Sequence, residues 1–92
     1  MQNYLDVCGT NEMVWFEIQP KEGKEFLRWA KSLGCVWING KEINPKDTTT
    51  FFHLSISDDG TLANVPMFAW LAKKYENVPK YNFSDFKNKR TL

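Results

Sequence analysis

Residues 24–34 read KEFLRWAKSLG, and this stretch decides the class of fold. Four of its apolar residues recur at i, i+3, i+4 and i+7: Phe26, Trp29, Ala30 and Leu33. That spacing places side chains along one face of an α-helix. Gly34 follows at the position where helices commonly end in a left-handed residue. We therefore predict an amphipathic helix over 21–33 whose apolar face packs on a core.

Alternating and β-branched runs on either side of this helix predict strands. Residues 13–18 alternate with a period of two, which is typical of a half-buried strand. Asn39-Gly40 separates two short extended runs in 35–43, a pair that favours a hairpin with both turn residues at positive φ. The runs 49–57 and 61–63 are predicted as two further strands, because β-branched and aromatic residues favour extended structure.

The remaining third of the chain predicts a second helix and a closing strand. Asn64 is the expected N-cap and Pro66 the first turn of a helix over 66–75. Four residues are expected to share its buried face: Phe68, Leu71, Ala72 and Tyr75. We expect this helix to be largely buried. Residues 78–83 are predicted as an edge strand, where Pro79 is tolerated.

These elements predict one α+β domain over residues 1–92, with a small, mostly antiparallel sheet packed with two helices. The expected order is roughly β-α-β-β-β-α-β. Residues 1–12 are expected to form an irregular N-terminal arm and residues 84–92 a frayed basic tail. The chain is 42% hydrophobic and 15% aromatic, which excludes the disordered class because disordered chains lack apolar side chains to bury.

Composition and the N-terminal sequence also indicate a compartment. The chain has two cysteines, fewer than a small secreted disulfide scaffold carries. It has no apolar run near the ~20 residues that span a bilayer, and residues 1–6 lack the pattern of a signal peptide. We expect free thiols, a cytoplasmic location in the host cell and no membrane partner.

Residue types that carry catalysis or bind metal are sparse. Cys8, Cys35 and His53 with Asp6 or Asp58 could supply the ligands of a metal site, but no Cys-x-x-Cys or His-x₃-His pair supports such a site. A Cys35–His53 nucleophile and base would lack a third, orienting group. Asp58-Asp59-Gly60 is ordinary turn chemistry, and no glycine-rich phosphate loop is present. We therefore expect no enzymatic activity, no metal and no cofactor.

The sheet is expected to have two apolar faces. Alternation predicts that eight side chains point to the core: Val14, Phe16, Ile18, Val36, Ile38, Phe52, Leu54 and Ile56. The opposite face would then hold Trp15, Cys35, Trp37, Phe51, His53 and Ser55. Two interpretations stay open: the second helix or the N-terminal arm covers these rings, or they form an open platform that anchors a protein or stacks a base.

Charge is concentrated near the C-terminus. Residues 73–92 hold six basic and two acidic side chains, a local net charge of +4, within a chain of net charge +1. The candidate contacts to a partner are Lys80, Lys87, Lys89 and Arg90. A solvated tail and an electrostatic contact to phosphate or to an acidic protein face are both consistent with this pattern.

A family resemblance rests on four short stretches of the chain. The helix 26–33 is followed by Gly34-Cys35-Val36-Trp37-Ile38-Asn39-Gly40, then by Asp59-Gly60-Thr61-Leu62 and by the closing segment 78–83. Over residues 21–83 the chain resembles small proteins of phages and mobile elements. The resemblance implies counter-defence work, as in anti-CRISPR proteins, and it transfers no site residue. Dispersed acidic residues argue against DNA mimicry.

The first functional hypothesis is a non-enzymatic phage or mobile-element protein that inhibits a host defence effector, such as a CRISPR nuclease, by protein–protein occlusion. Its anchors would be Trp15, Trp37 and Phe51, with His53 beside them and the basic tail steering the encounter. The alternative is a nucleotide or single-stranded nucleic-acid binding module that uses the same aromatic face and basic tail. A phage structural subunit is a third possibility.

Overall fold

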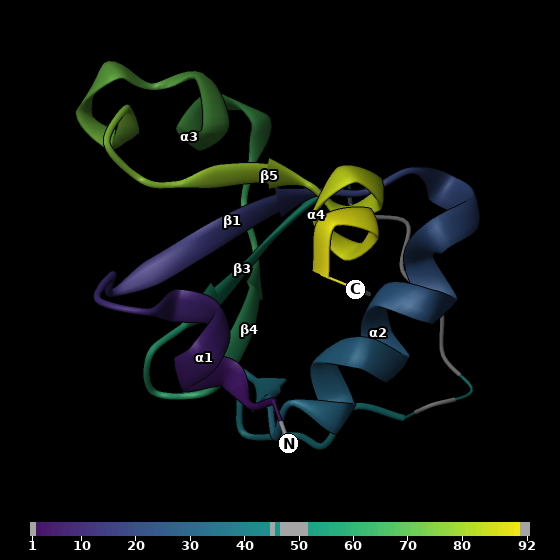
Figure 1. Ribbon diagram of the computed structural model, residues 1–92. Helices are drawn as coiled ribbons and strands as arrows, with labels where there is room; N and C mark the ends of the chain where they lie inside the picture. The colour runs from purple at the N-terminus through teal and green to yellow at the C-terminus, as the bar shows by residue number, and fades with distance from the viewer. Residues whose placement is uncertain (1, 45, 47–51, 91–92) are drawn as a thin grey trace.

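The computed structural model describes residues 2–44, 46 and 52–90, and of Lys89 and Arg90 it describes the backbone alone. Within this part of the chain, five strands form one mixed sheet. The strands are β1 (Met13–Glu17), β2 (Val36–Trp37), β3 (His53–Ser57), β4 (Thr61–Asn64) and β5 (Lys80–Asn82). The helices are α1 (Tyr4–Cys8), α2 (Gly23–Ser32), α3 (Met67–Leu71) and α4 (Phe83–Arg90). Two 3₁₀ turns are η1 (Pro20–Glu22) and η2 (Lys73–Tyr75). The predicted α+β class is confirmed (Figure 1).

The strand order is β2-β4-β3-β1-β5. Strand β3 pairs antiparallel with both β1 and β4, as expected. The outer pairs, β1 with β5 and β2 with β4, are parallel, so the sheet is mixed and not purely antiparallel. Parallel neighbours require a long crossover connection. Local alternation does not reveal such a connection, because it says which face a residue takes and not which strand lies beside it.

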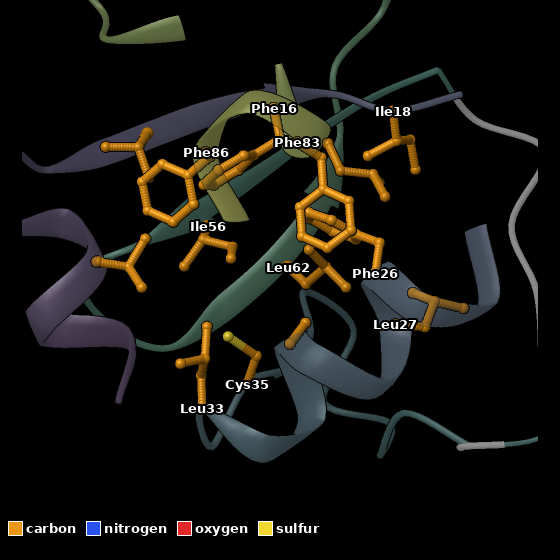
Figure 2. Close-up of a cluster of buried hydrophobic side chains, with 14 of the residues drawn as sticks. Phe16, Ile18, Phe26, Leu27, Leu33, Cys35, Ile56, Leu62, Phe83 and Phe86 are labelled. Carbon is orange, nitrogen blue, oxygen red and sulfur yellow. The ribbon is translucent and has the colours of Figure 1, made fainter. Parts of the chain in front are cut away.

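The hydrophobic core lies between one face of the sheet and helices α1, α2 and α4. Phe16 on β1 is fully buried. Its ring contacts the rings of Phe26 and Trp29 on α2 and the ring of Phe86 on α4. Phe83 packs edge-on against Phe26 at 5.0 Å between centroids (Figure 2). The predicted apolar stripe of α2 is confirmed, with three of its members buried and Trp29 half-buried.

Both ends of the described chain are helical where irregular structure was expected. Asn3 caps α1 by accepting from the amides of Leu5 and Asp6, and the Asp6 carboxylate accepts from the Asn3 amide at 2.8 Å. This is a capping box, which stabilises even a short helix. At the other end, α4 is fixed because Phe83 and Phe86 are buried in the core. The predictions of an irregular arm and a frayed tail were wrong for residues 4–8 and 84–90, and Phe83, predicted as the end of the edge strand, begins α4.

Tyr4 of α1 lies against a glycine. A Cβ at Gly60, whose φ is +86°, would come within 3.0 Å of the Tyr4 ring. The Tyr4 amide also donates to the carbonyl of Leu33 at 3.1 Å. The close approach therefore places α1 on the turn between β3 and β4.

Around β2 the predicted faces were wrong. Ile38 is 70% exposed and Val36 is half-buried, whereas Cys35 is buried in the core and Trp37 packs against it. The Asn39-Gly40 turn exists, but positive φ occurs at Gly40 alone, at +87°. Its amide donates to the carbonyl of Trp37 at 2.7 Å. A strand of two residues has no alternation from which a face can be read.

The start of β3 also differs from the prediction. Leu54 and Ile56 are fully buried in the core, as expected, but Phe52 is 54% exposed. Phe52 precedes the strand, so the alternation of β3 does not extend to it. Residues 49–51 of the predicted strand lie outside the described residues.

Candidate functional site

The second face of the sheet carries Trp15 on β1 and His53 on β3, both only 4% exposed. They are covered by α3 and η2, which lie on the side of the sheet away from α2 (Figure 1). The Trp70 ring stacks on His53 with 4.0 Å between centroids and on Trp15 at 6.1 Å. Tyr75 of η2 contacts Trp15 at 5.2 Å. The α3–η2 segment (residues 66–75) is therefore fixed to the sheet by ring contacts.

Polar groups at the edge of this cluster have partners. The Trp15 Nε1 donates to the Met13 sulfur at 3.1 Å. The Nε2 of His53 lies 3.3 Å from the Glu17 carboxylate, which is partly exposed. Lys80 Nζ stands 5.2 Å from the centre of the Trp15 ring. An open aromatic platform built on Trp15 and His53 is therefore wrong, and the interpretation in which the second helix covers them is correct.

The other predicted anchors lie apart from this cluster. Trp37 is on β2, at the opposite edge of the sheet from β5, and it packs against the core on the α2 side. Phe51 lies outside the described residues. Trp15 and Trp37 therefore do not form one surface.

Two of the four predicted basic contacts, Lys80 and Lys87, are bound within the protein. Lys80 Nζ donates to the carbonyl of Tyr75 at 2.7 Å and to that of Val78 at 3.2 Å. Lys87 Nζ bonds both oxygens of Glu25 at 2.8 and 2.9 Å, and this hydrogen bonding raises the pKa of Lys87. The side chains of Lys89 and Arg90 lie outside the described part. Lys80 and Lys87 thus have structural roles.

A buried carboxylate links α4 to the turn before α2. Glu22 is 4% exposed, accepts from the Ser84 hydroxyl of α4 and accepts from the Gln19 amide at 2.9 Å. Burial raises the pKa of Glu22, but the hydrogen bonds from Ser84 and Gln19, with the Lys87 charge, outweigh it and hold this pKa below its ordinary value. The contact fastens the start of α4 to the turn before α2.

We expect Ser84→Ala to lower the free energy of unfolding by about 1–3 kcal/mol near neutral pH, because a buried ionised acceptor loses its donor. A depressed pKa contributes stability above the ordinary glutamate pKa, and this is lost as the pH falls through the folded value. The difference between Ser84→Ala and wild type should therefore shrink below that range. Urea unfolding at neutral and acidic pH measures it, and a difference unchanged by pH would contradict the assignment to Glu22.

Both thiols lie in the core. Cys8 and Cys35 are free and buried, and the Cys8 sulfur donates to the carbonyl of Ile56 at 3.4 Å. Burial raises the pKa of Cys35 to about 12, so it is a thiol and not a nucleophilic thiolate near neutral pH. His53 lies across the sheet from both, so Cys35 and His53 do not meet. Within the described ranges, no three side chains of His, Cys, Asp and Glu are grouped to hold a metal ion.

Helix α3 exposes three adjacent apolar side chains that we call the α3 ridge: Met67, Phe68 and Leu71. Their exposed fractions are 55%, 78% and 74%. At about 100° per residue these three positions fall within an arc of about 100° on the helix surface, and Trp70, which packs on the sheet, lies outside that arc. The prediction of a buried second helix was wrong, since α3 has no buried residue.

Two local features produce this outcome. Asn64 ends β4 and Pro66 is the N-cap, so the helix starts later than expected. Ala72 is extended, with φ −72° and ψ 134°, so the helix stops at Leu71 and η2 restarts in another phase. The predicted stripe through Ala72 and Tyr75 therefore does not exist. The sequence signal for the ridge was the excess of apolar residues in 67–71, which exceeds what one helix face can bury.

A shallow hollow of about 210 Å³ lies beside η2. Its lining comes from the loop before β1 and from the segment after α3: Asn11, Glu12, Met13, Lys74, Asn77, Val78 and Pro79. Pockets for drug-sized ligands measure roughly 300–1,000 Å³. This hollow is therefore of a size to receive a single side chain.

No family model matches this chain, and no curated protein or solved structure matches it. Among the described residues, no helix is both long and apolar enough to cross a membrane.

Proposed function

We propose that this chain is a non-catalytic binding protein that occupies the surface of a partner protein through the α3 ridge. The observation that carries the proposal is the juxtaposition of Met67, Phe68 and Leu71, each more than half exposed on a single short helix. Contiguous apolar groups exposed by a folded domain mark interaction sites. The ridge replaces Trp15 and Trp37 as the proposed anchor.

The ridge has the properties of an interface anchor. Its helix is held in place from below, since Trp70 stacks on His53 and Tyr75 contacts Trp15. A pre-positioned anchor loses little conformational freedom on binding, which favours affinity. The groups on which chemistry would depend support a non-catalytic role, because Cys35 is a buried thiol and His53 is enclosed by Glu17 and Trp70.

The specific form of the proposal is inhibition of a host defence effector, such as a CRISPR nuclease, by a protein of phage or mobile-element origin. Its support is the resemblance of residues 21–83 to small phage proteins. Two free, buried cysteines support a reducing cytoplasm as the location. In this form the ridge covers a functional surface of the effector, so inhibition is stoichiometric.

The nucleic-acid alternative receives less support. Stacking needs exposed rings and phosphate binding needs available cations. Trp15 and His53 are buried, and Lys80 and Lys87 already bind groups of the protein. The residues on which that alternative relies are therefore engaged within the protein. Of the three exposed side chains of the ridge only Phe68 is aromatic, so the ridge favours apolar contact with a protein over base stacking, and we retain protein binding as the proposed function.

Replacement of Phe68 by Asp tests the proposal. The purified wild-type chain is cross-linked in a lysate of a host with an active defence system, and the captured protein is purified for calorimetry. We expect Phe68→Asp to weaken binding of that protein by about 30-fold or more, the loss typical of a central anchor. A purified CRISPR nuclease gives the second measurement, with cleavage blocked at equimolar wild-type chain and restored by Phe68→Asp.

Ile38→Asp is the matched control, because Ile38 is equally exposed but lies on the turn after β2. This variant should bind as wild type does. Equal affinity of Phe68→Asp and wild type would reject the ridge as the anchor. If the nuclease still cleaves its substrate at an equimolar amount of wild-type chain, inhibition of that nuclease is rejected. The calorimetric result then decides whether the ridge binds a partner.

A further inference from the structure

The charges beside the ridge carry information about its partner. Residues 65–80 contain three lysines and one acid, Glu76, a local net charge of +2. Lys73 and Lys74 follow the ridge directly on η2 and are exposed, and Lys74 Nζ lies 5.0 Å from the centre of the Tyr75 ring. Lys80 is held by two backbone carbonyls. Positive charge is thus displayed at the end where the ridge meets η2.

The spacing of the ridge indicates how it docks. Leu71 follows Met67 by four residues and Phe68 by three. Side chains at these spacings lie on one face of a helix, as do the anchors that a helix inserts into an apolar groove. Helix α3 lies on one side of the sheet, and α2 and α4 lie on the other side (Figure 1). It is therefore accessible to a concave surface.

From these two observations we propose that the occupant of the ridge is an apolar groove on a protein partner, with carboxylates on the rim that faces Lys73 and Lys74. This inference rests on the proposed function and adds the chemistry of the partner. Opposite charge at the rim of an interface speeds association and fixes orientation. In this arrangement the apolar contact to Phe68 and Leu71 supplies the affinity, and the carboxylates of the rim orient the partner relative to α3.

A second copy of the chain fits the surface less well. Residues 65–80 of a second copy would bring three lysines and one acid, so that copy offers little negative charge to Lys73 and Lys74. Three side chains also expose on the order of a few hundred Å², against the ~800 Å² per partner of a stable interface. A lipid surface is also a poorer match, since α3 has five residues and two flanking lysines contribute only about 1 kcal/mol each.

The experiment uses the full chain and the partner purified by the Phe68-dependent capture described above. Association rates and affinities are measured at low and moderate salt for wild type and for the double variant Lys73→Glu, Lys74→Glu. We expect the double variant to bind about tenfold more weakly at low salt, mainly through slower association. Wild-type affinity should fall as salt rises, and that of the variant should not fall.

The matched control is Lys21→Glu, Lys24→Glu, which makes the same change in net charge at two exposed lysines near the start of α2. The rim inference predicts that this control binds within about threefold of wild type. Equal losses in both double variants would show an effect of net charge alone and overturn the inference. No loss at Lys73 and Lys74 would overturn it as well.

The outcomes separate this inference from the proposed function. A partner that depends on Phe68 but not on Lys73 and Lys74 leaves the proposed function standing and removes the carboxylate rim. If no captured protein depends on Phe68, both fall. Sedimentation that shows a Phe68-dependent dimer, or flotation with phosphatidylcholine–phosphatidylserine vesicles that is lost in Phe68→Asp, overturns the inference in favour of a second copy or a lipid surface.

Discussion

Replacement of Phe16 by Ala is expected to lower the free energy of unfolding by about 3–5 kcal/mol, the range for a large aromatic ring removed from a packed core. Phe16 is fully buried at the centre of the ring cluster between the sheet and the helices (Figure 2). Its ring contacts those of Phe26, Trp29 and Phe86, from two different helices. The cavity would therefore weaken the attachment of α2 and α4 together.

Phe68→Ala is the matched control for this prediction. It makes the same chemical change at a side chain that is 78% exposed. Substitutions at exposed positions usually change stability by less than about 0.5 kcal/mol. Urea unfolding followed by circular dichroism compares the two variants. Equal losses in both would mean that Phe68 packs in the folded domain, which would also remove the ridge as a binding surface.

The second large effect is expected for Trp15→Ala, which should cost about 3–5 kcal/mol of unfolding free energy. Trp15 is 4% exposed and lies beneath Trp70 and Tyr75. It also stands 5.2 Å from the Lys80 ammonium. An open aromatic anchor would behave differently, because its removal would lower partner affinity and leave stability unchanged.

Limited trypsin digestion extends the Trp15 prediction to the α3–η2 segment. Lys73 and Lys74 lie in η2, which Tyr75 attaches to Trp15. Trp15→Ala should accelerate cleavage at these two lysines, whereas Phe16→Ala, on the other face of the sheet, should loosen the core first. Stability within about 0.5 kcal/mol of wild type, with unchanged cleavage, would contradict the burial of Trp15.

Loss of Trp15 also has a consequence for binding. The contacts of Trp70 with His53 and Trp15 fix the rotation of α3 about its axis, and in this rotation the ridge is exposed. Two residues that the sequence suggested as direct contacts to a partner thus position the helix that carries the proposed contacts. Their role in the proposed function is to hold Met67, Phe68 and Leu71 in one orientation.

From the candidate site, the sequence predicted that aromatic residues lie on the second face of the sheet. An excess of aromatic residues over the needs of one core face was inferred from Trp15, Trp37 and Phe51, and of these Trp15 belongs to the site. The sequence did not show which apolar residues of 66–75 stay exposed, because the predicted apolar face assumes one continuous helix through Ala72. The extended conformation of Ala72 interrupts that phase. Trp70 then packs inward and Phe68 and Leu71 outward.

The sequence by itself determined the local elements whose signals lie within a few residues. These are the amphipathic stripe of α2, the alternation of β1, the central part of β3 and the α+β class. Only the tertiary structure decided the parallel pairing of β5 with β1, the burial of Trp15 and the docking of α4 through Phe83 and Phe86. These features join residues far apart in the chain. Local propensity carries no information about them, because they depend on which distant surfaces meet.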